Sequence, residues 1–299
     1  SPRILSCFIV ENDAVASSGI RYGGGGVCGY KSSLSLIECL IAYNTCSYSD
    51  SNTGGGGISL TFGNGSPLLQ ECVIRDNDGL EYGGLHASQG CSPILDDCII
   101  KDNSGTGITT YGSNMSLENC EITGHAAGGI LVSVYSSTSP TNITNCMISD
   151  NQAGRGIQIR NPLGGLIEGC IIENHNSTSM TDGGAGGGIR STYSGPLDIK
   201  DCIVRNNTAR SGGGIYLDDN AVGEIQNCIV TGNSATSSWT GSGGGMLIGS
   251  ATLDNCTVSN NFARTSGGGI QCTGDLALIN CTIESNETIS NSRFPAIRS

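Results

Sequence analysis

One short phrase, Cys-x-Ile/Val-x-x-Asn, recurs from one end of the chain to the other. Successive copies of its leading cysteine are 22 to 33 residues apart. An uneven period in this range is typical of a solenoid, in which each coil is one structural repeat and insertions enter its loops. The leading cysteines are Cys7, Cys39, Cys72, Cys98, Cys120, Cys146, Cys170, Cys202, Cys228, Cys256 and Cys281.

Apolar and polar residues alternate around each of these cysteines. Ile or Leu stands three residues before every one of them, and Ile or Val stands two residues after it, as Leu117 and Ile122 do around Cys120. A period of two indicates a β-strand with one buried face. We therefore predict that the cysteine and the residue two positions later point inward, and that the residue between them points outward.

A polar residue stands five positions after the cysteine in every copy. It is Asn in nine copies, and His125 and His175 in the other two. An amide repeated once per coil at a bend predicts a ladder, in which each side chain bonds its neighbours at the strand spacing of about 4.8 Å. We expect the two histidines to have the same structural role as the asparagines.

A glycine cluster followed by an apolar residue comes next in most copies, as in Gly54 to Gly57 before Ile58. Glycine supplies positive φ angles and lets neighbouring backbones stack closely. With the two strands around the cysteine, this segment gives three short strands per coil. The sequence therefore predicts an all-β fold, a right-handed parallel β-helix of about 11 coils. We expect residues 1–299 to form a single solenoid domain, and no end cap is evident.

The composition excludes several classes of partner. The net charge of −12 argues against nucleic acid, which requires a basic surface. No apolar run approaches the roughly 20 residues that span a bilayer, so we expect no membrane insertion. An acidic repeat array rich in Ser, Thr, Asn and Gly predicts an extracellular or cell-surface protein.

The pairing of Gly-Gly-Gly-Ile with a later Ile-x-x-Asn resembles the repeats of polymorphic outer-membrane proteins, which read Gly-Gly-Ala-Ile and Phe-x-x-Asn. More broadly, the chain resembles the right-handed β-helix proteins of the pectin-lyase-like superfamily. The resemblance covers the whole chain and implies the fold. It implies no one activity, because that superfamily includes lyases, hydrolases, adhesins and autotransporter passengers. Ile or Val replaces Phe here, and no C-terminal β-barrel segment follows, so membrane anchoring by this chain is not expected.

The chain has 15 cysteines, and 11 of them occupy the repeated position. Free cysteine behaves as a small, deeply buried apolar residue, so we predict buried structural thiols along this column. Four cysteines lie elsewhere. Cys28 and Cys46 belong to neighbouring coils and are a candidate disulfide, whereas Cys91 and Cys272 have no evident partner.

Carboxylates are the strongest enzymatic candidates. Asp218 and Asp219 follow a Gly-Gly-Gly-Ile segment. They are the candidate catalytic residues if the chain is an enzyme, since a glycoside hydrolase needs two carboxylates across one sugar. The signatures that the resemblance would imply for a hydrolase or a lyase are not found in order. His86 is expected on the surface, and no Ser/His/Asp set can be assembled.

Two further carboxylate pairs, Asp76 with Asp102 and Glu71 with Asp97, occupy repeated columns. Solvated surface charge is the simpler explanation of these columns. No cofactor is predicted, although a weak surface calcium site on stacked carboxylates stays open.

Asn-x-Ser/Thr sequons would be N-glycosylated only in a protein secreted by a glycosylating cell. They begin at Asn64, Asn114, Asn142, Asn176, Asn206, Asn255, Asn280 and Asn286.

The repeated positions are regular along the whole chain, and no coil stands out by a cluster of reactive side chains. We therefore predict a non-enzymatic extracellular rod with a structural or adhesive role. The alternative is a polysaccharide lyase or glycoside hydrolase. The first residues already match an internal copy: Ser1-Pro2 precedes Cys7 as Ser66-Pro67 precedes Cys72. The partners expected are another copy stacked head to tail into a filament, or the rest of a longer chain, and a carbohydrate ligand.

Overall fold

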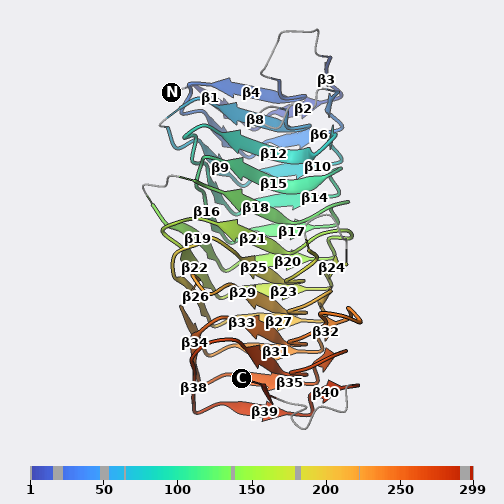
Figure 1. Cartoon of the computed structure of the whole chain (residues 1–299). Coiled ribbons are helices and arrows are strands. Elements are labelled where there is room, and N and C mark those ends of the chain that lie inside the picture. Colours follow the sequence, from blue (N-terminus) through green and yellow to red (C-terminus); the bar gives the residue numbers. More distant parts are fainter. Residues whose placement is uncertain are drawn as a thin grey trace. The chain divides into compact units, whose positions relative to one another are not determined.

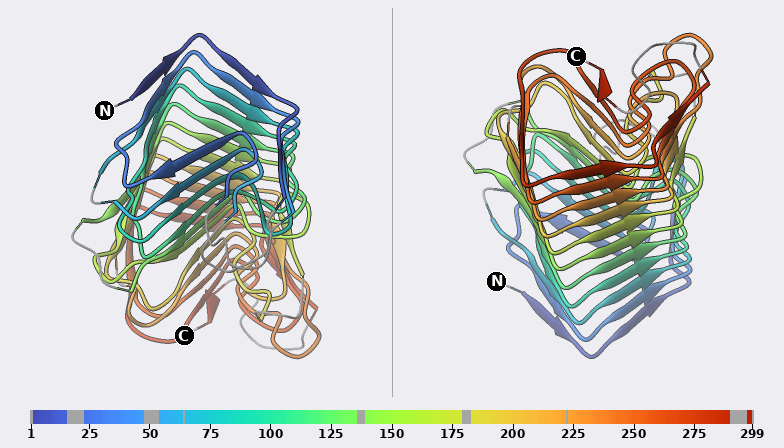
Figure 2. Two further views of the ribbon diagram at one scale, coloured as in Figure 1. Left: turned by 90° about the horizontal axis from the view of Figure 1, so that it is seen from above. Right: turned by 90° about the horizontal axis from the view of Figure 1, so that it is seen from below.

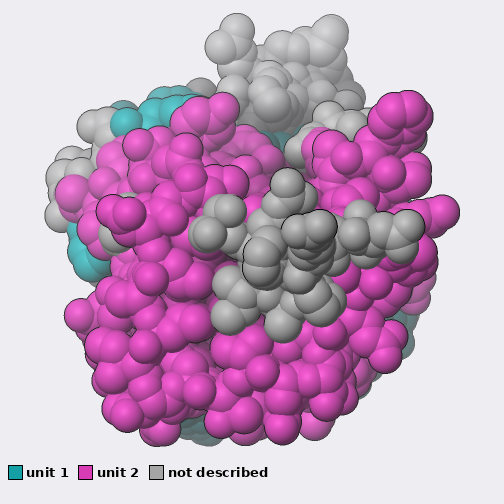
Figure 3. All heavy atoms as spheres, turned by 60° about the horizontal axis from the view of Figure 1, so that its bottom comes forward, with its two compact units in different colours: residues 1–147 teal, residues 148–299 magenta. Residues whose placement is uncertain are grey.

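The computed structural model describes residues 2–15, 23–47, 54–63, 65–135, 139–178, 183–221, 223–289 and 297–298. The chain divides into two compact units, Ser1–Met147 and Ile148–Ser299 (Figure 3). Within each unit, short strands of one coil pair in parallel with those of the next (Figure 1). The predicted parallel β-helix is thereby confirmed. That the whole chain forms a single domain stays a prediction.

Three sheets run through each unit. Strands of sheet A end two residues before the repeated cysteine, strands of sheet B begin one residue after it, and strands of sheet C follow the glycine cluster. Among the described residues each of the three types occurs eleven times, which agrees with about 11 predicted coils. Seen along the stack, the coils of each unit overlie one another, and sheets A and B meet at a bend (Figure 2).

Sheet A comprises β1 (Arg3–Leu5), β5 (Ser35–Ile37), β9 (Leu68–Gln70), β13 (Ile94–Asp96), β16 (Ser116–Glu118) and β19 (Thr141–Thr144) in unit 1, and β22 (Gly165–Glu168), β26 (Leu197–Lys200), β30 (Glu224–Gln226), β34 (Ala251–Asp254) and β38 (Leu276–Ile279) in unit 2. Sheet B comprises β2 (Phe8–Val10), β6 (Leu40–Ala42), β10 (Val73–Arg75), β14 (Ile99–Lys101) and β17 (Glu121–Thr123) in unit 1, β20 (Met147–Ser149) at the boundary, and β23 (Ile171–Glu173), β27 (Ile203–Arg205), β31 (Ile229–Thr231), β35 (Thr257–Ser259) and β39 (Thr282–Glu284) in unit 2.

Sheet C comprises β4 (Val27–Tyr30), β8 (Ile58–Thr61), β12 (Tyr82–Ser88), β15 (Thr106–Tyr111) and β18 (Ile130–Ser133) in unit 1, and β21 (Ile157–Arg160), β25 (Ile189–Ser191), β29 (Ile215–Leu217), β33 (Met246–Ile248), β37 (Ile270–Cys272) and β41 (Ile297–Arg298) in unit 2. Shorter corner strands follow the amide column: β3 (Asp13–Ala14), β7 (Thr45–Cys46), β11 (Asp78–Gly79), β24 (Asn176–Ser177), β28 (Thr208–Ala209), β32 (Ser234–Ala235), β36 (Phe262–Ala263) and β40 (Glu287–Thr288).

The core is built from the predicted columns, stacked without a register shift. Ile74 of β10 pairs with Ile41 on one side and with Ile100 on the other. All three side chains are fully buried, as is Cys72. A single coil on its own would expose this apolar column to water. Each coil therefore depends on its neighbours to cover the column. The inward assignment of the cysteine and of the residue two positions later is confirmed for the inner coils.

Two residues in every coil bend the chain through left-handed backbone conformations. One stands just before the cysteine, as Asp97 does with a φ of 50°, and the other just before the amide, as Asp102 does with a φ of 52°. Asp and Asn tolerate this region better than most residues. Chain geometry therefore explains Asp76, Asp97 and Asp102 in the carboxylate columns, and Glu71 occupies the same bend position with a φ of 52°.

The repeated cysteines have a hydrogen-bonding role in addition to packing. Cys98 donates its thiol hydrogen to the carbonyl oxygen of Asp96 at 3.3 Å, and its sulfur also lies 3.4 Å from that of Leu69 in the preceding coil. Cys72 makes the same contacts with Gln70 and Leu36. The thiol thus satisfies a carbonyl group at the bend between sheets A and B, which an apolar side chain could not do.

The predicted amide ladder is present in both units. Asn77 accepts hydrogen bonds on Oδ1 from the backbone and side-chain nitrogens of Asn44 at 3.0 and 2.9 Å. Its Nδ2 donates to the carbonyl oxygen of Ile41 and to Oδ1 of Asn103. The last glycine of each cluster makes room for this ladder: a Cβ on Gly57 would lie 3.0 Å from Nδ2 of Asn77. The Gly-Gly-Gly-Ile and Ile-x-x-Asn segments are therefore coupled by contact.

Candidate functional site

A groove of about 810 Å³ lies over the outer face of sheet C in unit 2. Its floor is a column of four outward side chains in register, Arg190 of β25, Tyr216 of β29, Leu247 of β33 and Gln271 of β37. Each strand contributes one side chain at the inter-strand spacing of about 4.8 Å, so the floor repeats along the coil axis. Such a floor suits an extended ligand.

One wall of the groove comes from the segments that precede the glycine clusters. Trp239 lies in this wall and is 89% exposed. Its turn is fixed by Ser237, whose Oγ accepts hydrogen bonds from the backbone N–H groups of Trp239 and Thr240 at 3.4 and 3.2 Å. The remaining wall residues are small or hydroxylated. An indole that is exposed but held by an ordered turn can contact a ligand without rearrangement.

The described lining of the groove includes a positive charge and no carboxylate. Arg190 is the charged residue among the described groove-lining residues, and its guanidinium lies 5.9 Å from the centre of the Tyr216 ring. Burial, as the largest cause, raises the pKa of Tyr216, so its hydroxyl is neutral and able to donate a hydrogen bond at physiological pH. Aromatic faces, hydroxyls and one cation are groups that can contact a polar ring.

Asp218 and Asp219, the candidate catalytic residues of the alternative enzymatic function, lie at the edge of this groove. Asp218 accepts backbone N–H groups from Tyr193 on one oxygen at 2.7 Å and from Asn220 and Ala221 on the other. Its carboxylate therefore caps a turn. Asp219 is exposed, and it accepts a hydrogen bond from the hydroxyl of Thr273, a groove-lining residue, at 3.3 Å.

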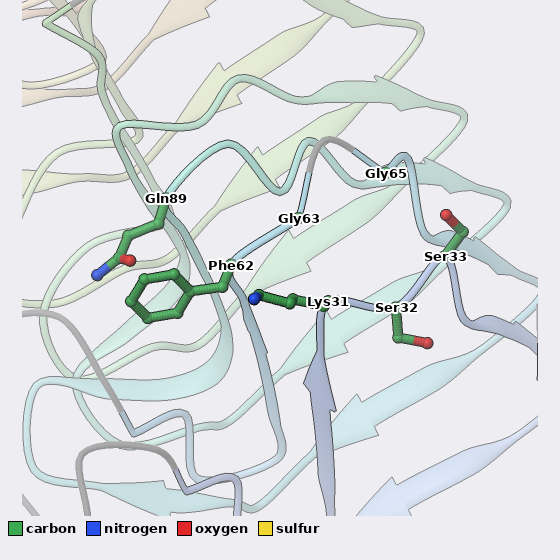
Figure 4. A pocket seen from close by; sticks show the side chains of 7 residues that line it. All are labelled: Lys31, Ser32, Ser33, Phe62, Gly63, Gly65 and Gln89. Carbon is green, nitrogen blue, oxygen red and sulfur yellow. The ribbon is translucent and has the colours of Figure 1, made fainter.

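A smaller pocket of about 440 Å³ lies in unit 1, at the ends of β4, β8 and β12. The ring of Phe62 lies between the side chains of Lys31 and Gln89 (Figure 4). The ammonium group of Lys31 is 5.4 Å from the centre of the Tyr30 ring. Most of the other lining positions are serine or glycine. The described residues of this pocket offer one cation but no acid and base pair.

The remaining predicted residues are spread through the fold. Cys28 is exposed and Cys46 is buried, and both are free thiols in the structure. A disulfide between them stays a prediction. Within the described ranges no three His, Cys, Asp or Glu side chains gather as a metal site, and the weak calcium site stays an expectation. The same ranges contain no helix suited to crossing a membrane.

The expectation that His86 lies on the surface is wrong. His86 points outward from β12 but is fully buried, and its ring stacks on Tyr82 at 4.5 Å between centres. Tyr111 of the next strand is 6.1 Å away. Ser59 and Thr109, which flank His86 on the neighbouring strands β8 and β15, are likewise buried although they point outward. The alternation of apolar and polar residues shows which way a side chain points from its strand, but not whether other segments bury it.

The model of a right-handed β-helix region matches residues 6–142 and 132–250. The chain therefore belongs to the right-handed β-helix family, and the predicted handedness is confirmed. Among solved structures, a pectate lyase, Pel9A, is similar with a TM-score of 0.45 at 10% sequence identity. That similarity covers 88% of this chain and 73% of the lyase chain. No curated protein matches the sequence.

Proposed function

We propose that this chain is an extracellular β-helix rod with an adhesive role, and that its unit 2 groove binds a linear polysaccharide without cleaving it. The observation that carries the proposal is the lining of the groove. It combines Trp239, Tyr216 and hydroxyl groups with one cation, and no carboxylate stands among its described residues. Hydrolysis of a glycosidic bond requires a pair of carboxylates, whereas binding does not.

The geometry of the floor supports an extended sugar chain as the ligand. The strand spacing of about 4.8 Å is close to the length of one hexose unit, so successive sugars would meet successive side chains. Arg190 favours a ligand that bears carboxylate groups, because guanidinium binds carboxylate through charge-assisted hydrogen bonds. Rings stacked on Trp239 would bury apolar area that is now exposed.

Affinity measurements on a panel of acidic and neutral polysaccharides test this proposal. Trp239→Ala should weaken binding at least tenfold. Tyr135→Ala is the matched control, because Tyr135 is a similarly exposed aromatic residue of unit 1. Equal affinity of wild type and Trp239→Ala for every bound polysaccharide would remove the groove from the proposal.

The second candidate function is a polysaccharide lyase or glycoside hydrolase. It is favoured by the contact of Asp219 with Thr273, which holds an exposed carboxylate at the edge of the groove. Incubation with the same panel, followed by assays for new reducing ends and for unsaturated products, decides between the two. Turnover that Asp219→Ala abolishes would establish the enzyme and reject the non-enzymatic rod.

The coil at one end of unit 1 supports stacking on another coil. Cys7 is exposed, whereas Cys39 in the next coil is 2% exposed, and Ile4 and Ile9 are only half-buried. At the end of unit 2, Leu278 is 38% exposed although Leu253 of the same column is fully buried. A further β-helix coil would cover these residues and pair the strand edges.

That coil would come from a second copy stacked head to tail or from a neighbouring part of a longer protein. Light scattering and electron microscopy of residues 1–299 separate these sources. Filaments would support self-stacking. A monomer at high concentration would reject self-stacking and leave a neighbouring part of a longer protein as the source of the covering coil.

Secretion would make the sequons targets for N-glycosylation. Asn114 and Asn286 are buried, and Asn286 is part of the amide ladder, so neither is a target in the folded protein. Asn64 lies outside the described residues. The exposed candidates are Asn142, Asn176, Asn206, Asn255 and Asn280. Mass spectrometry of protein made in a glycosylating cell should find glycans confined to exposed sequons.

A further inference from the structure

The two histidines of the amide ladder reproduce its hydrogen bonds with an imidazole. In an asparagine coil, Oδ1 accepts the backbone N–H of the preceding ladder residue, and Nδ2 donates to a carbonyl of the preceding coil. His125 accepts the N–H of Asn103 on Nδ1 at 3.2 Å, and its Nε2 lies 3.1 Å from the carbonyl oxygen of Ile100. One ring therefore replaces the carbonyl and amino groups of the amide.

His175 makes the same pair of contacts in unit 2. Its Nδ1 accepts the N–H of Asn151 at 3.4 Å, and its Nε2 lies 3.1 Å from the carbonyl oxygen of Ile148. The backbone N–H of His175 donates to Oδ1 of Asn207, so the ladder continues beyond it. Each unit thus contains one imidazole in its ladder.

These contacts define the protonation state of both rings. An N–H group points at Nδ1, so Nδ1 must carry a lone pair, and Nε2 must carry the hydrogen that reaches the carbonyl oxygen. A second proton on Nδ1 would face the N–H of Asn103 or Asn151, and two donors repel. An amide cannot be protonated in this way, so only the two histidine coils have this property.

Packing leaves the rings little room to turn away. His125 is fully buried and His175 is 1% exposed. A Cβ on Gly107 would lie 2.3 Å from Nε2 of His125, and a Cβ on Gly156 would lie 2.6 Å from Nε2 of His175. Beside each imidazole, the glycine position therefore has no room even for a methyl group.

We propose that His125 and His175 form an acid-sensitive switch, in which protonation of either imidazole breaks the amide ladder and opens the β-helix at that coil. The charged groups that act on the rings are Asp102 for His125 and Asp150 for His175. Both carboxylates are exposed bend residues next to the ladder, and their attraction for imidazolium is screened by solvent.

The direction of the pKa shift agrees with the geometry. Burial lowers the pKa of both His125 and His175 to about 4, against about 6.5 for an exposed histidine. The unfolded chain therefore binds protons more readily than the folded chain between these values. The contribution of each neutral ring to stability is fully present above pH 6.5 and is lost as the pH falls towards 4.

Denaturant unfolding between pH 7.5 and pH 4 tests the switch, with His125→Asn/His175→Asn as the decisive variant. Asparagine restores the common ladder residue and cannot titrate. Each histidine should lower the folding equilibrium constant of the wild type about 150-fold over this range, because its pKa is about 6.5 in the unfolded chain and about 4 in the folded chain, where the ring is half protonated at pH 4. The double variant should not show this part of the pH dependence.

The two single variants should each remove about half of the effect on the logarithmic scale. His86→Gln serves as the control, because His86 is the remaining histidine and lies outside the ladder. Identical pH dependence of wild type and double variant would overturn the proposal. If the double variant does not fold, NMR titration of the wild-type imidazoles decides, and a pKa near 6.5 for both rings would also overturn it.

Discussion

Replacement of Asn77 by alanine perturbs the amide ladder in the middle of unit 1. The side chain of Asn77 makes hydrogen bonds to the backbone and side-chain nitrogens of Asn44, to the carbonyl oxygen of Ile41 and to Oδ1 of Asn103. Alanine removes all four of these bonds. It leaves the buried N–H of Asn44 and the carbonyl of Ile41 without these partners.

The cost of this substitution follows from the contacts. A neutral hydrogen bond contributes about 1 kcal/mol net, and a buried polar group left without a partner costs about 1 to 3 kcal/mol. The loss should therefore be about 4 to 6 kcal/mol, which is a large fraction of the stability of an ordinary domain. Asn12→Ala is the matched control, since Asn12 occupies the same column but is exposed and bonds a ladder neighbour on one side only.

Urea unfolding and hydrogen exchange measure the effect at two levels. The free energy of unfolding should fall by several kcal/mol for Asn77→Ala and by less than about 1 kcal/mol for Asn12→Ala. Exchange should accelerate most at the backbone N–H of Asn44, which loses its acceptor. A loss below about 1 kcal/mol for Asn77→Ala, with unchanged exchange at Asn44, would refute the role of the ladder.

Three further substitutions probe other parts of the structure. Gly57→Ala should destabilise unit 1 by about 2 kcal/mol or more, because its Cβ would lie 2.8 Å from the carbonyl oxygen of Gly84; calorimetry checks this. Cys146→Ser should cost about 1 kcal/mol or less, since its hydroxyl can donate to the carbonyl oxygen of Thr144, 3.1 Å from the sulfur, and thermal unfolding measures the loss. Native thiol labelling should modify Cys7 rapidly and Cys146 only on unfolding.

The sequence was informative about the coil because its constraints repeat. Each apolar column is copied once per coil, so the alternation around residues such as Cys98 and Ile100 identifies strands and inward positions without any tertiary information. The amide column is equally direct, since a polar side chain that recurs beside buried residues must bond its own copies. The replacement of Asn by His125 and His175 was correctly assigned for the same reason.

Features that depend on neighbouring coils were harder to predict. Asp97 and Asp102 stand at the bends before Cys98 and Asn103, where aspartate tolerates a positive φ. This conformational role is overlooked when carboxylates are considered only as candidate catalytic or metal-binding groups. The thiol of Cys98 also donates to a carbonyl oxygen, which the behaviour of cysteine as a small apolar residue did not suggest.

The groove was not predicted, because its parts are far apart in the sequence. Arg190, Tyr216, Leu247 and Gln271 share one column only through the register of sheet C. The lengths of the segments before the glycine clusters vary, so the position of Trp239 opposite this column could not be derived from the repeat. Strand alternation after each glycine cluster was the signal that could have identified the floor.

Titration of the unmodified protein with polysaccharide fragments of increasing length, followed by tryptophan fluorescence, tests whether the groove of unit 2 binds a polysaccharide without cleaving it. Trp239 is the only tryptophan of the chain and lies in the groove wall, so it reports on this site alone. We expect a saturable spectral shift whose affinity rises with fragment length until the floor is filled, while the fragments remain intact. An unchanged spectrum at high concentrations of every fragment would show that the groove does not bind these polysaccharides, and shortening of the fragments during the titration would show that the protein cleaves them.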